Sequence, residues 1–163
     1  MFSKWFKKSS GEDRPSFQAD HVITDPDSTT RDQALKFIAQ QMHQAGYVGS
    51  ADAFFSALAE RETKDTTGFK DQIATPHAKS RQVKHAGIWV VHFANEIPWE
   101  TMDERPVKTA VAFAIPLKGG EEAMAPLIAI SRANMKQAFR DVLNHGDKET
   151  ITAAIEDVTG GRA

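Results

Sequence analysis

Cysteine is absent from this chain of 163 residues, and so is any long apolar run. Without cysteine there is no disulfide framework and no thiolate to act as a nucleophile or bind a metal. No stretch approaches the roughly 20 apolar residues that cross a bilayer. The first residues also lack the apolar core of about 7–15 residues that a secretory signal needs. These absences exclude thiol chemistry and predict a cytoplasmic protein.

Neither sign of charge dominates the sequence. The chain has 20 Lys and Arg side chains and 22 Asp and Glu side chains, which gives a formal net charge of −2. No basic stripe follows the N-terminus, and we therefore expect no nucleic-acid partner. Hydrophobic residues make up 40% and charged residues 26%, which are values typical of a globular protein. The length suits one domain with one core.

The N-terminal stretch differs from the rest of the chain. Phe2, Trp5 and Phe6 alternate with lysines, and a linker-like segment with Ser, Gly and Asp follows. We predict a flexible extension over residues 1–19 and a folded domain over residues 20–160, because an amphipathic piece of two turns is too short to be stable alone. The alternative is that this aromatic and basic piece contacts a membrane surface.

Two helices are predicted in the first half of the chain. Thr30 and Gln33 form a capping-box pattern at the start of the first helix, and Gly46 ends it. The second helix is expected from about residue 50 to Arg61. A cation is favoured at the C-terminal end of a helix, so a purely structural role for Arg61 is one alternative.

Three segments are predicted to be strands, over residues 21–24, 88–93 and 107–115. The segment 88–93 is apolar on both faces apart from His92, which indicates a strand covered on both sides. The segment 107–115 alternates larger residues on one face with three alanines on the other. We expect a helix to pack closely against the alanine face.

Three more helices are predicted in the last third of the chain. The first of them follows Gly119-Gly120 and has Pro126 in its first turn, where proline is tolerated. Asn134 is expected to cap the next helix and Gly146 to end it, and Asp147 to cap the last. Helices interleaved with buried strands predict an α/β sandwich in a single domain.

His77 lies in the run Ile-Ala-Thr-Pro-His-Ala-Lys-Ser. A residue before proline favours extended backbone, so Thr75 is expected to be strand-like and the chain to turn at or after Pro76, which exposes the imidazole. A neutral imidazole nitrogen is a nucleophile near pH 7 and forms covalent intermediates. Arg61 and Lys79 are cations suited to a phosphoryl group. The alternative is an ordinary surface histidine.

A longer pattern surrounds this histidine. It consists of Arg61-Glu62, Thr67, Ile73-Ala74 and Pro76-His77. This pattern resembles the active-site signature of the type-2 IIA components of the bacterial phosphotransferase system (PTS), the mannitol/fructose-specific family that includes the nitrogen-regulatory IIA proteins. The resemblance extends over roughly residues 20–158. It implies the mannitol-type IIA fold, a single-domain α/β sandwich with a central mixed β-sheet and about five flanking helices.

The resemblance, together with the position of Lys79 beside His77, indicates roles for five side chains. His77 would be the phosphoacceptor, and Arg61 would present its guanidinium to the phosphoryl oxygens. Lys79 would be a second phosphoryl-binding cation or a solvated residue on the rim that faces the partner. Thr67 would donate to the phosphoryl group or hold the turn, and Asp71 would interact with Arg61. No metal or other cofactor is expected, because the cations come from the protein.

The partners implied are proteins of the same system. The phosphocarrier HPr would donate the phosphoryl group, and a cysteine of an EIIB domain would receive it for uptake of a fructose- or mannitol-class sugar. Membrane contact would be indirect, through EIIC. One alternative is a regulatory protein of the nitrogen-PTS type, whose phosphorylation state at His77 controls partner binding. Another is an interaction module of the same fold without phosphoryl chemistry.

Two positions depart from the family pattern. Many transport-type members have glycine where this chain has Lys70, while Gly68 lies two residues earlier, so the loop before the site is expected to follow a different path. Many members also open the third helix with His-Leu, close to the phosphorylated histidine, where this chain has Ala123-Met124. This difference favours the regulatory alternative. His92 is interpreted as a half-buried, hydrogen-bonded histidine, with an approach to the site as the alternative.

Overall fold

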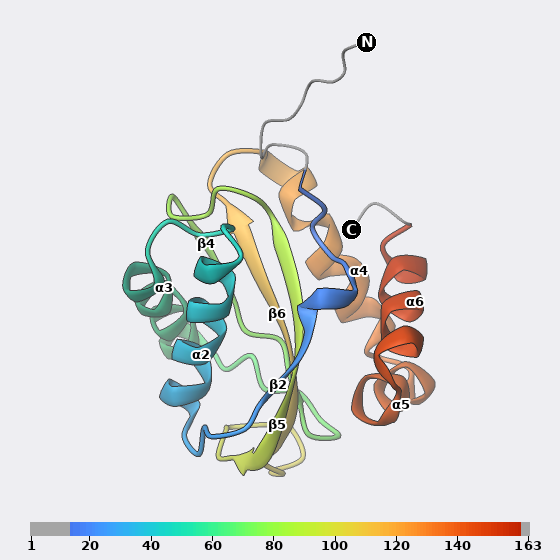
Figure 1. Ribbon diagram of the computed structural model, residues 1–163. Helices are drawn as coiled ribbons and strands as arrows, with labels where there is room; N and C mark the ends of the chain where they lie inside the picture. The colour runs from blue at the N-terminus through green and yellow to red at the C-terminus, as the bar shows by residue number, and fades with distance from the viewer. Residues whose placement is uncertain (1–13, 161–163) are drawn as a thin grey trace.

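The structure, a computed structural model, describes residues 14–160, and its centre is one mixed β-sheet (Figure 1). The strands in sheet order are β2 (Val22–Asp25), β5 (Gly87–Ile97), β6 (Val107–Pro116) and, side by side along β6, β3 (Ile73–Ala74) and β4 (His77–Ser80). β2 runs parallel to β5, β5 runs antiparallel to β6, and β3 and β4 both run parallel to β6. The predicted mixed sheet is confirmed.

Five α-helices of the described residues cover this sheet on two sides (Figure 1). One layer holds α2 (Arg31–Gln44) and α3 (Ala51–Lys64). The other holds α4 (Ala125–Ala133), α5 (Gln137–His145) and α6 (Lys148–Val158). Short 3-10 turns precede β2 and α4, at Ala19–His21 and Gly120–Met124. The predicted α/β sandwich with about five helices is therefore confirmed.

The two faces of the sheet bury two different cores. The alanines of β6 contact the α2 and α3 layer, and Val111, Phe113 and Ile115 of the same strand contact the layer of α4, α5 and α6. β5 divides in the same way, with Trp89 on one face and Val90 on the other. Side chains of a strand alternate between faces, so one pattern in the sequence specifies both cores.

Local sequence signals set several helix ends. The Thr30 hydroxyl accepts the Gln33 backbone N–H at 3.1 Å, and the Gln33 side chain accepts the Thr29 N–H at 2.8 Å. Asp147 accepts the Thr150 N–H at 2.8 Å and caps α6 in the same manner. Gly46 follows α2 with φ of +87°, a conformation that glycine adopts without a steric penalty.

The prediction that Asn134 caps the helix following α4 is wrong. Asn134 instead ends α4, where its N–H donates to the Ile130 carbonyl at 2.9 Å, and α5 begins three residues later at Gln137, with Lys136 at its N-cap. The Asn134 carbonyl accepts a hydrogen bond from Arg140 at 2.7 Å. A turn at residues 133–136 thus occupies the place expected for the cap.

The last part of the predicted N-terminal extension is an ordered part of the fold. Phe17 is buried in the core, and the Ser16 carbonyl accepts the Ile88 N–H at 2.7 Å. Tyr47 donates its hydroxyl to the Pro15 carbonyl at 2.6 Å. Residues 1–13, which include the aromatic and basic piece, lie outside the described residues. Within residues 14–160, no helix is long and apolar enough to cross a membrane.

Candidate functional site

His77 is the first residue of a strand. β3 and β4 follow the same edge of β6, with Ala74 opposite Ala110 and His77 opposite Phe113. Pro76 lies in the two-residue gap and has no N–H for the ladder, but its carbonyl still accepts the Phe113 N–H at 3.0 Å. The predicted turn at Pro76 is therefore wrong, because the chain continues along β6 after only a short interruption.

A backbone carbonyl fixes the orientation of the His77 ring. The ring nitrogen Nδ1 lies 2.8 Å from the Thr75 carbonyl oxygen. A carbonyl oxygen can only accept, so Nδ1 carries the proton and donates it. In the neutral ring the other nitrogen, Nε2, then keeps its lone pair. The geometry thus makes Nε2 the nucleophilic atom of this side chain.

The surroundings of His77 favour the neutral ring. Burial lowers the pKa of the half-buried imidazole below its ordinary value of 6.5. The bond to Thr75 opposes this shift, the Arg61 charge lowers the pKa further, and the Glu62 charge raises it. Because desolvation is the largest of these effects, the ring is unprotonated at neutral pH.

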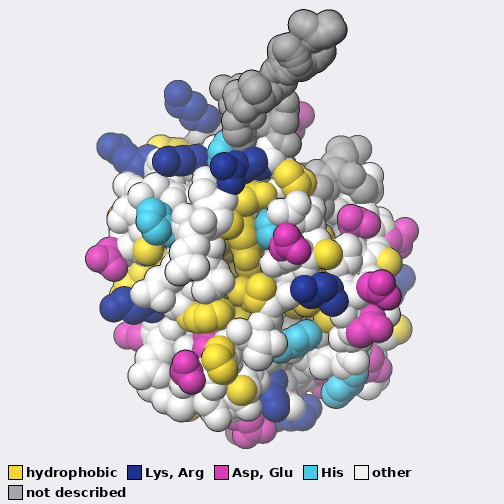
Figure 2. Space-filling model, in the orientation of Figure 1, with side chains coloured by type: hydrophobic (Ala, Val, Ile, Leu, Met, Phe, Trp, Pro, Cys, Tyr) yellow, Lys and Arg dark blue, Asp and Glu magenta, His cyan; other side chains and the backbone are white. Residues whose placement is uncertain are grey.

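His77 lies in a cavity of about 400 Å³ together with three cations. Arg61 and Lys64 come from the last turn of α3, and Lys79 comes from β4. The remaining residues of the wall are Ala57, Glu60, Ala78, Ile115 and Met124. On the face drawn in Figure 2, Lys and Arg side chains gather at the upper end of the molecule. The predicted residues His77, Arg61 and Lys79 are thus brought together.

Thr67 does not line this cavity. Its N–H donates to the Glu62 carboxylate at 3.1 Å, and its hydroxyl donates to the second oxygen of the same carboxylate. Both Thr67 and Glu62 are buried. The structure therefore places the Thr67 side chain inside the loop before the site, away from the cavity wall.

Asp71 lies away from His77, and its predicted interaction with Arg61 is wrong. Its carboxylate accepts from Arg140 at 2.6 Å and lies 3.6 Å from Arg105. Arg61 instead donates to the Asp65 carbonyl. Parallel pairing with β6 directs the start of β3 toward α5, and this separates Asp71 from α3. A second cavity of about 500 Å³ begins there and has Asp71 in its wall.

The loop before the site is shaped by a close approach and by unusual backbone angles. A Cβ on Gly68 would lie 2.1 Å from the Glu100 carbonyl oxygen, so only glycine fits this position. Asp71 and Gln72 both have positive φ, of 55° and 64°, a conformation that is uncommon for residues other than glycine. Lys70, where many family members have glycine, has no positive φ.

The residues in or beside the cavity that the predicted set missed include Lys64, Met124 and Glu62. Lys64 lies three residues after Arg61 on the same helix face. It was missed because the helix was predicted to end at about Arg61, whereas α3 continues to Lys64. Met124 lines the cavity, while its neighbour Ala123 lies outside it. Glu62 belongs to the signature pattern, but nothing in that pattern shows that its side chain is buried beneath the loop.

His92 lies against α5, in the wall of the second cavity and not in the wall of this one. Its Nε2 bonds to the Leu143 carbonyl of α5 at 2.7 Å, as the interpretation of a half-buried, hydrogen-bonded histidine predicts. Among the described residues, no group of three or more His, Cys, Asp or Glu side chains is arranged to hold a metal ion.

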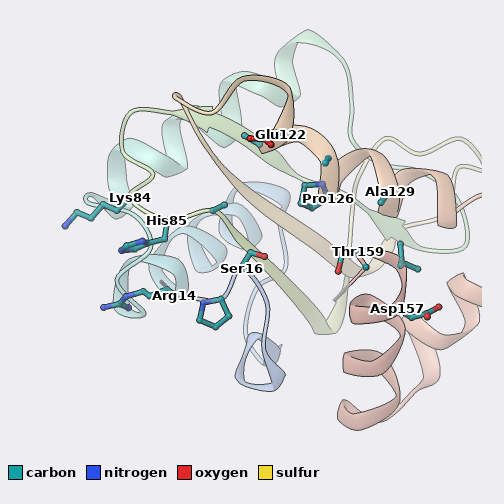
Figure 3. Close-up of a pocket in the computed structure, with 15 residues that line it drawn as sticks. Arg14, Ser16, Lys84, His85, Glu122, Pro126, Ala129, Asp157 and Thr159 are labelled. Atoms are coloured by element: carbon teal, nitrogen blue, oxygen red, sulfur yellow. The ribbon is translucent and has the colours of Figure 1, made fainter. Parts of the chain in front are cut away.

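A larger groove of about 1110 Å³ lies near both ends of the described chain, and Figure 3 shows its lining. Arg14, Lys84 and His85 lie on one side of it, and Glu122 and Asp157 lie on the other. None of the predicted site residues is in its wall.

Comparison with known proteins gives a family match over most of the chain. Residues 15–158 match the family described as phosphoenolpyruvate-dependent sugar phosphotransferase system, EIIA 2. The PTS system fructose-specific EIIA component of Haloferax volcanii is 32% identical over 130 residues, which cover 79% of this chain and 84% of that protein.

Solved structures share the fold at low sequence identity. The nitrogen regulatory protein IIA-Ntr of Neisseria meningitidis has a TM-score of 0.75 and 18% identity, with 85% of this chain and 94% of that chain covered. IIA mannitol from Escherichia coli has a TM-score of 0.67 and 14% identity, with 85% of this chain and 98% of that chain covered. Enzyme IIAMTL in complex with phosphorylated enzyme IIBMTL, also from Escherichia coli, has a TM-score of 0.67 and 17% identity, with 90% of this chain and 98% of that chain covered.

The family match, the sequence similarity to a fructose-specific component and the shared fold lead to one conclusion. The chain belongs to the EIIA type-2 family and is an IIA component of the phosphoenolpyruvate-dependent sugar phosphotransferase system.

Proposed function

We propose that Nε2 of His77 accepts a phosphoryl group from phospho-HPr and passes it to the cysteine of an EIIB domain. The observation that carries this proposal is the contact of 2.8 Å between Nδ1 and the Thr75 carbonyl. It leaves Nε2 unprotonated in a ring whose pKa is lowered by burial. A nucleophile of this kind attacks phosphorus without needing a separate base.

Bond formation and bond cleavage balance in both transfers. In the first step Nε2 forms a bond to phosphorus while the bond between phosphorus and the donor breaks, and the donor atom keeps the electron pair. In the second step the cysteine thiolate of EIIB attacks phosphorus and the electron pair returns to Nε2. The Nδ1 proton stays on the ring throughout, bonded to Thr75.

The cations of the cavity supply the charge stabilisation that phosphoryl transfer requires. Arg61 can present two N–H groups to phosphoryl oxygens. Lys64 and Lys79 add point charges in the same cavity. Thr67 and Asp71 contribute by holding the loop before β3, through Glu62 and Arg140 respectively.

The partners are proposed from the comparisons and from the resemblance. The structure of enzyme IIAMTL with phosphorylated enzyme IIBMTL supports an EIIB partner for this fold. The fructose-specific component of Haloferax volcanii supports a sugar of the fructose or mannitol class. HPr follows from the signature around His77.

A regulatory role is the second candidate function. Two observations favour it, namely the shared fold with a nitrogen regulatory IIA protein and Ala123, which stands outside the cavity wall at the position where many transport-type members carry a histidine. In that role phosphorylation of His77 changes the affinity for a regulated partner.

Phosphorylation by phosphoenolpyruvate, enzyme I and HPr, followed by intact mass, tests both functions. We expect the gain of one acid-labile phosphoryl group. Addition of the cognate EIIB then separates them: discharge within seconds supports transport, and a phosphoprotein that persists supports regulation. A chain that stays unlabelled while HPr is labelled would overturn both.

A further inference from the structure

A buried carboxylate lies directly beneath the loop that leads to His77. Glu62 is 5% exposed and accepts three hydrogen bonds, from the Thr67 N–H at 3.1 Å, from the Thr67 hydroxyl and from the Trp99 indole N–H at 3.3 Å. A carboxylate is costly to bury unless donors of this kind compensate it. Successive side chains on a helix diverge by about 100°, so Arg61 lines the cavity while Glu62 points inward.

The donors of Glu62 continue into the hydrogen bond that orients His77. The Thr67 carbonyl accepts the Thr75 N–H at 3.0 Å, and the Thr75 carbonyl accepts the Nδ1 proton of His77 at 2.8 Å. One unbroken series of contacts thus leads from the carboxylate through two threonines to the imidazole. Each threonine is held through its backbone on one side and holds the next group on the other.

Hydrogen bonds that do not involve Glu62 hold the rest of the loop between α3 and β3. The Thr66 hydroxyl donates to the Glu100 carbonyl at 2.7 Å, and the Phe69 N–H donates to the Ile73 carbonyl at 2.8 Å. Neither bond involves Thr67 or Glu62. Loss of the carboxylate therefore removes the bonds that fix the Thr67 N–H and hydroxyl, while the remainder of the loop and the β6 contacts of Ala74 and Pro76 stay in place.

We propose that Glu62 is a positioning residue that acts through Thr67 and Thr75 to hold His77 in its Nδ1–H tautomer, with Nε2 as the nucleophile. This inference deepens the proposed function and rests on it for its consequence in phosphoryl transfer. Without the carboxylate, the Thr67 carbonyl that accepts the Thr75 N–H shifts, and the Thr75 carbonyl is held opposite Nδ1 only through its neighbours on β6, so its contact with Nδ1 loosens. The proton then distributes between the two nitrogens, and a fraction of the rings presents Nε2 as N–H, which cannot attack phosphorus.

The primary measurement is the tautomer of His77 in the unphosphorylated protein, by ¹⁵N NMR of histidine side chains at pH 8. We expect a single Nδ1–H tautomer in the wild type and a mixture in Glu62→Ala. The phosphorylation rate by phospho-HPr should fall in the same variant, on the order of 10–100-fold, as for a reacting group that loses its fixed position.

Two further variants should change the His77 tautomer less than Glu62→Ala does. Glu62→Gln keeps an oxygen that can accept from the Thr67 N–H and from the indole, and it should retain the wild-type tautomer. Thr67→Val keeps the backbone bond and loses only the hydroxyl bond, and it should show an intermediate mixture. A merely structural role would lower stability in these variants and leave the tautomer unchanged.

Asp25→Ala is the matched control. Asp25 is also a buried carboxylate that accepts loop N–H groups, from Asp27 at 3.2 Å and from Ser28 at 3.1 Å. It pairs with Phe93 at the end of the sheet opposite to the pairing of His77 with Phe113. Its loss should reduce stability without changing the His77 tautomer.

A folded Glu62→Ala protein that keeps only the Nδ1–H tautomer would overturn the inference. If this variant does not fold, Thr67→Val decides, and an unchanged tautomer there would overturn it equally. The tautomer is measured without any PTS protein. A wild type that HPr cannot label would therefore refute the proposed function and leave the tautomer result standing.

Discussion

Arginine and lysine side chains gather at two places along the segment that contains β3 and β4, and the two clusters differ in what they contact. At the α5 side, Arg140 and Arg105 both lie against the Asp71 carboxylate, and Asn144 donates to the Asp71 carbonyl. At the α3 side, Arg61, Lys64 and Lys79 surround His77 and take part in no ion pair among residues 14–160.

The difference indicates that the cluster at α5 stabilises the fold and that the cluster at α3 serves phosphoryl transfer. Cations that already have a carboxylate partner stabilise a turn whose residues Asp71 and Gln72 have positive φ, a strained conformation that its surroundings must hold in place. Cations without such a partner remain available for a dianionic group that arrives from another protein. Substitutions at the first cluster should therefore affect folding, and substitutions at the second should affect transfer.

Removal of His77 is expected to have the largest effect on the α3 side. His77→Ala should abolish phosphorylation completely and leave the thermal unfolding midpoint within a few degrees, because the half-buried imidazole makes little of the core. Intact mass and circular dichroism check the two parts. His43→Ala is the control, since His43 also bonds its Nδ1 to a backbone carbonyl but lies away from the cavity, and it should label normally. Labelled His77→Ala would show that another residue is the acceptor.

Removal of Arg140 should have the largest effect on the α5 side. Its side chain is 8% exposed, and its loss leaves the Asp71 carboxylate, among the described residues, with only the more distant Arg105, at 3.6 Å. Arg140→Ala should lower the free energy of unfolding by about 2–4 kcal/mol, measured by urea denaturation. Arg105→Ala should lose less than about 1 kcal/mol, because its side chain is 53% exposed. An equal loss of unfolding free energy in the two variants would contradict the structural role given to Arg140.

Arg61→Ala should affect the phosphorylation rate much more than the stability. We expect phosphorylation by phospho-HPr to slow by about 10–100-fold, since a bidentate cation at the phosphoryl group is lost. The free energy of unfolding should change by less than about 1 kcal/mol, as for a partly exposed residue at a helix end. Rapid-quench kinetics and urea denaturation measure the two quantities. A variant that loses stability and keeps its rate would place Arg61 among the structural cations.

The pH dependence should be the smallest effect near neutrality. Because burial lowers the pKa of His77 below 6.5, the transfer rate should stay constant from pH 8 to about 6.5 and fall only at lower pH, as the ring becomes protonated. The unfolded chain binds the proton more readily than the folded one. The contribution of His77 to stability is therefore present above pH 6.5 and lost as the pH falls. His77→Gln should remove that part of the slope.

Local patterns in the sequence were enough for most of the fold. Thr30, Gln33 and Asp147 cap helices as expected because capping depends on residues three positions apart. The alanines of β6 face α2 and α3 because strand side chains alternate. The residues around His77 also predicted Arg61 and Lys79 as cations near the histidine, and the structure places both in the same cavity.

The parts that could not be predicted depend on residues far apart in the chain. Arg140 lies 69 residues from Asp71, and no local pattern joins them. The course of β3 and β4 along one edge of β6, which makes His77 a strand residue, is a tertiary pairing that a proline in the sequence conceals. The burial of Glu62 likewise depends on Trp99, 37 residues away.

The position of the phosphoryl group on the His77 ring is the most direct test of this account. Protein labelled with ¹⁵N at histidine, phosphorylated through HPr and observed by ³¹P and ¹⁵N NMR, distinguishes the two ring nitrogens. The hydrogen bond from Nδ1 to Thr75 predicts phosphorylation at Nε2 alone. Phosphorylation at Nδ1, or at another residue, would contradict the mechanism built on that bond.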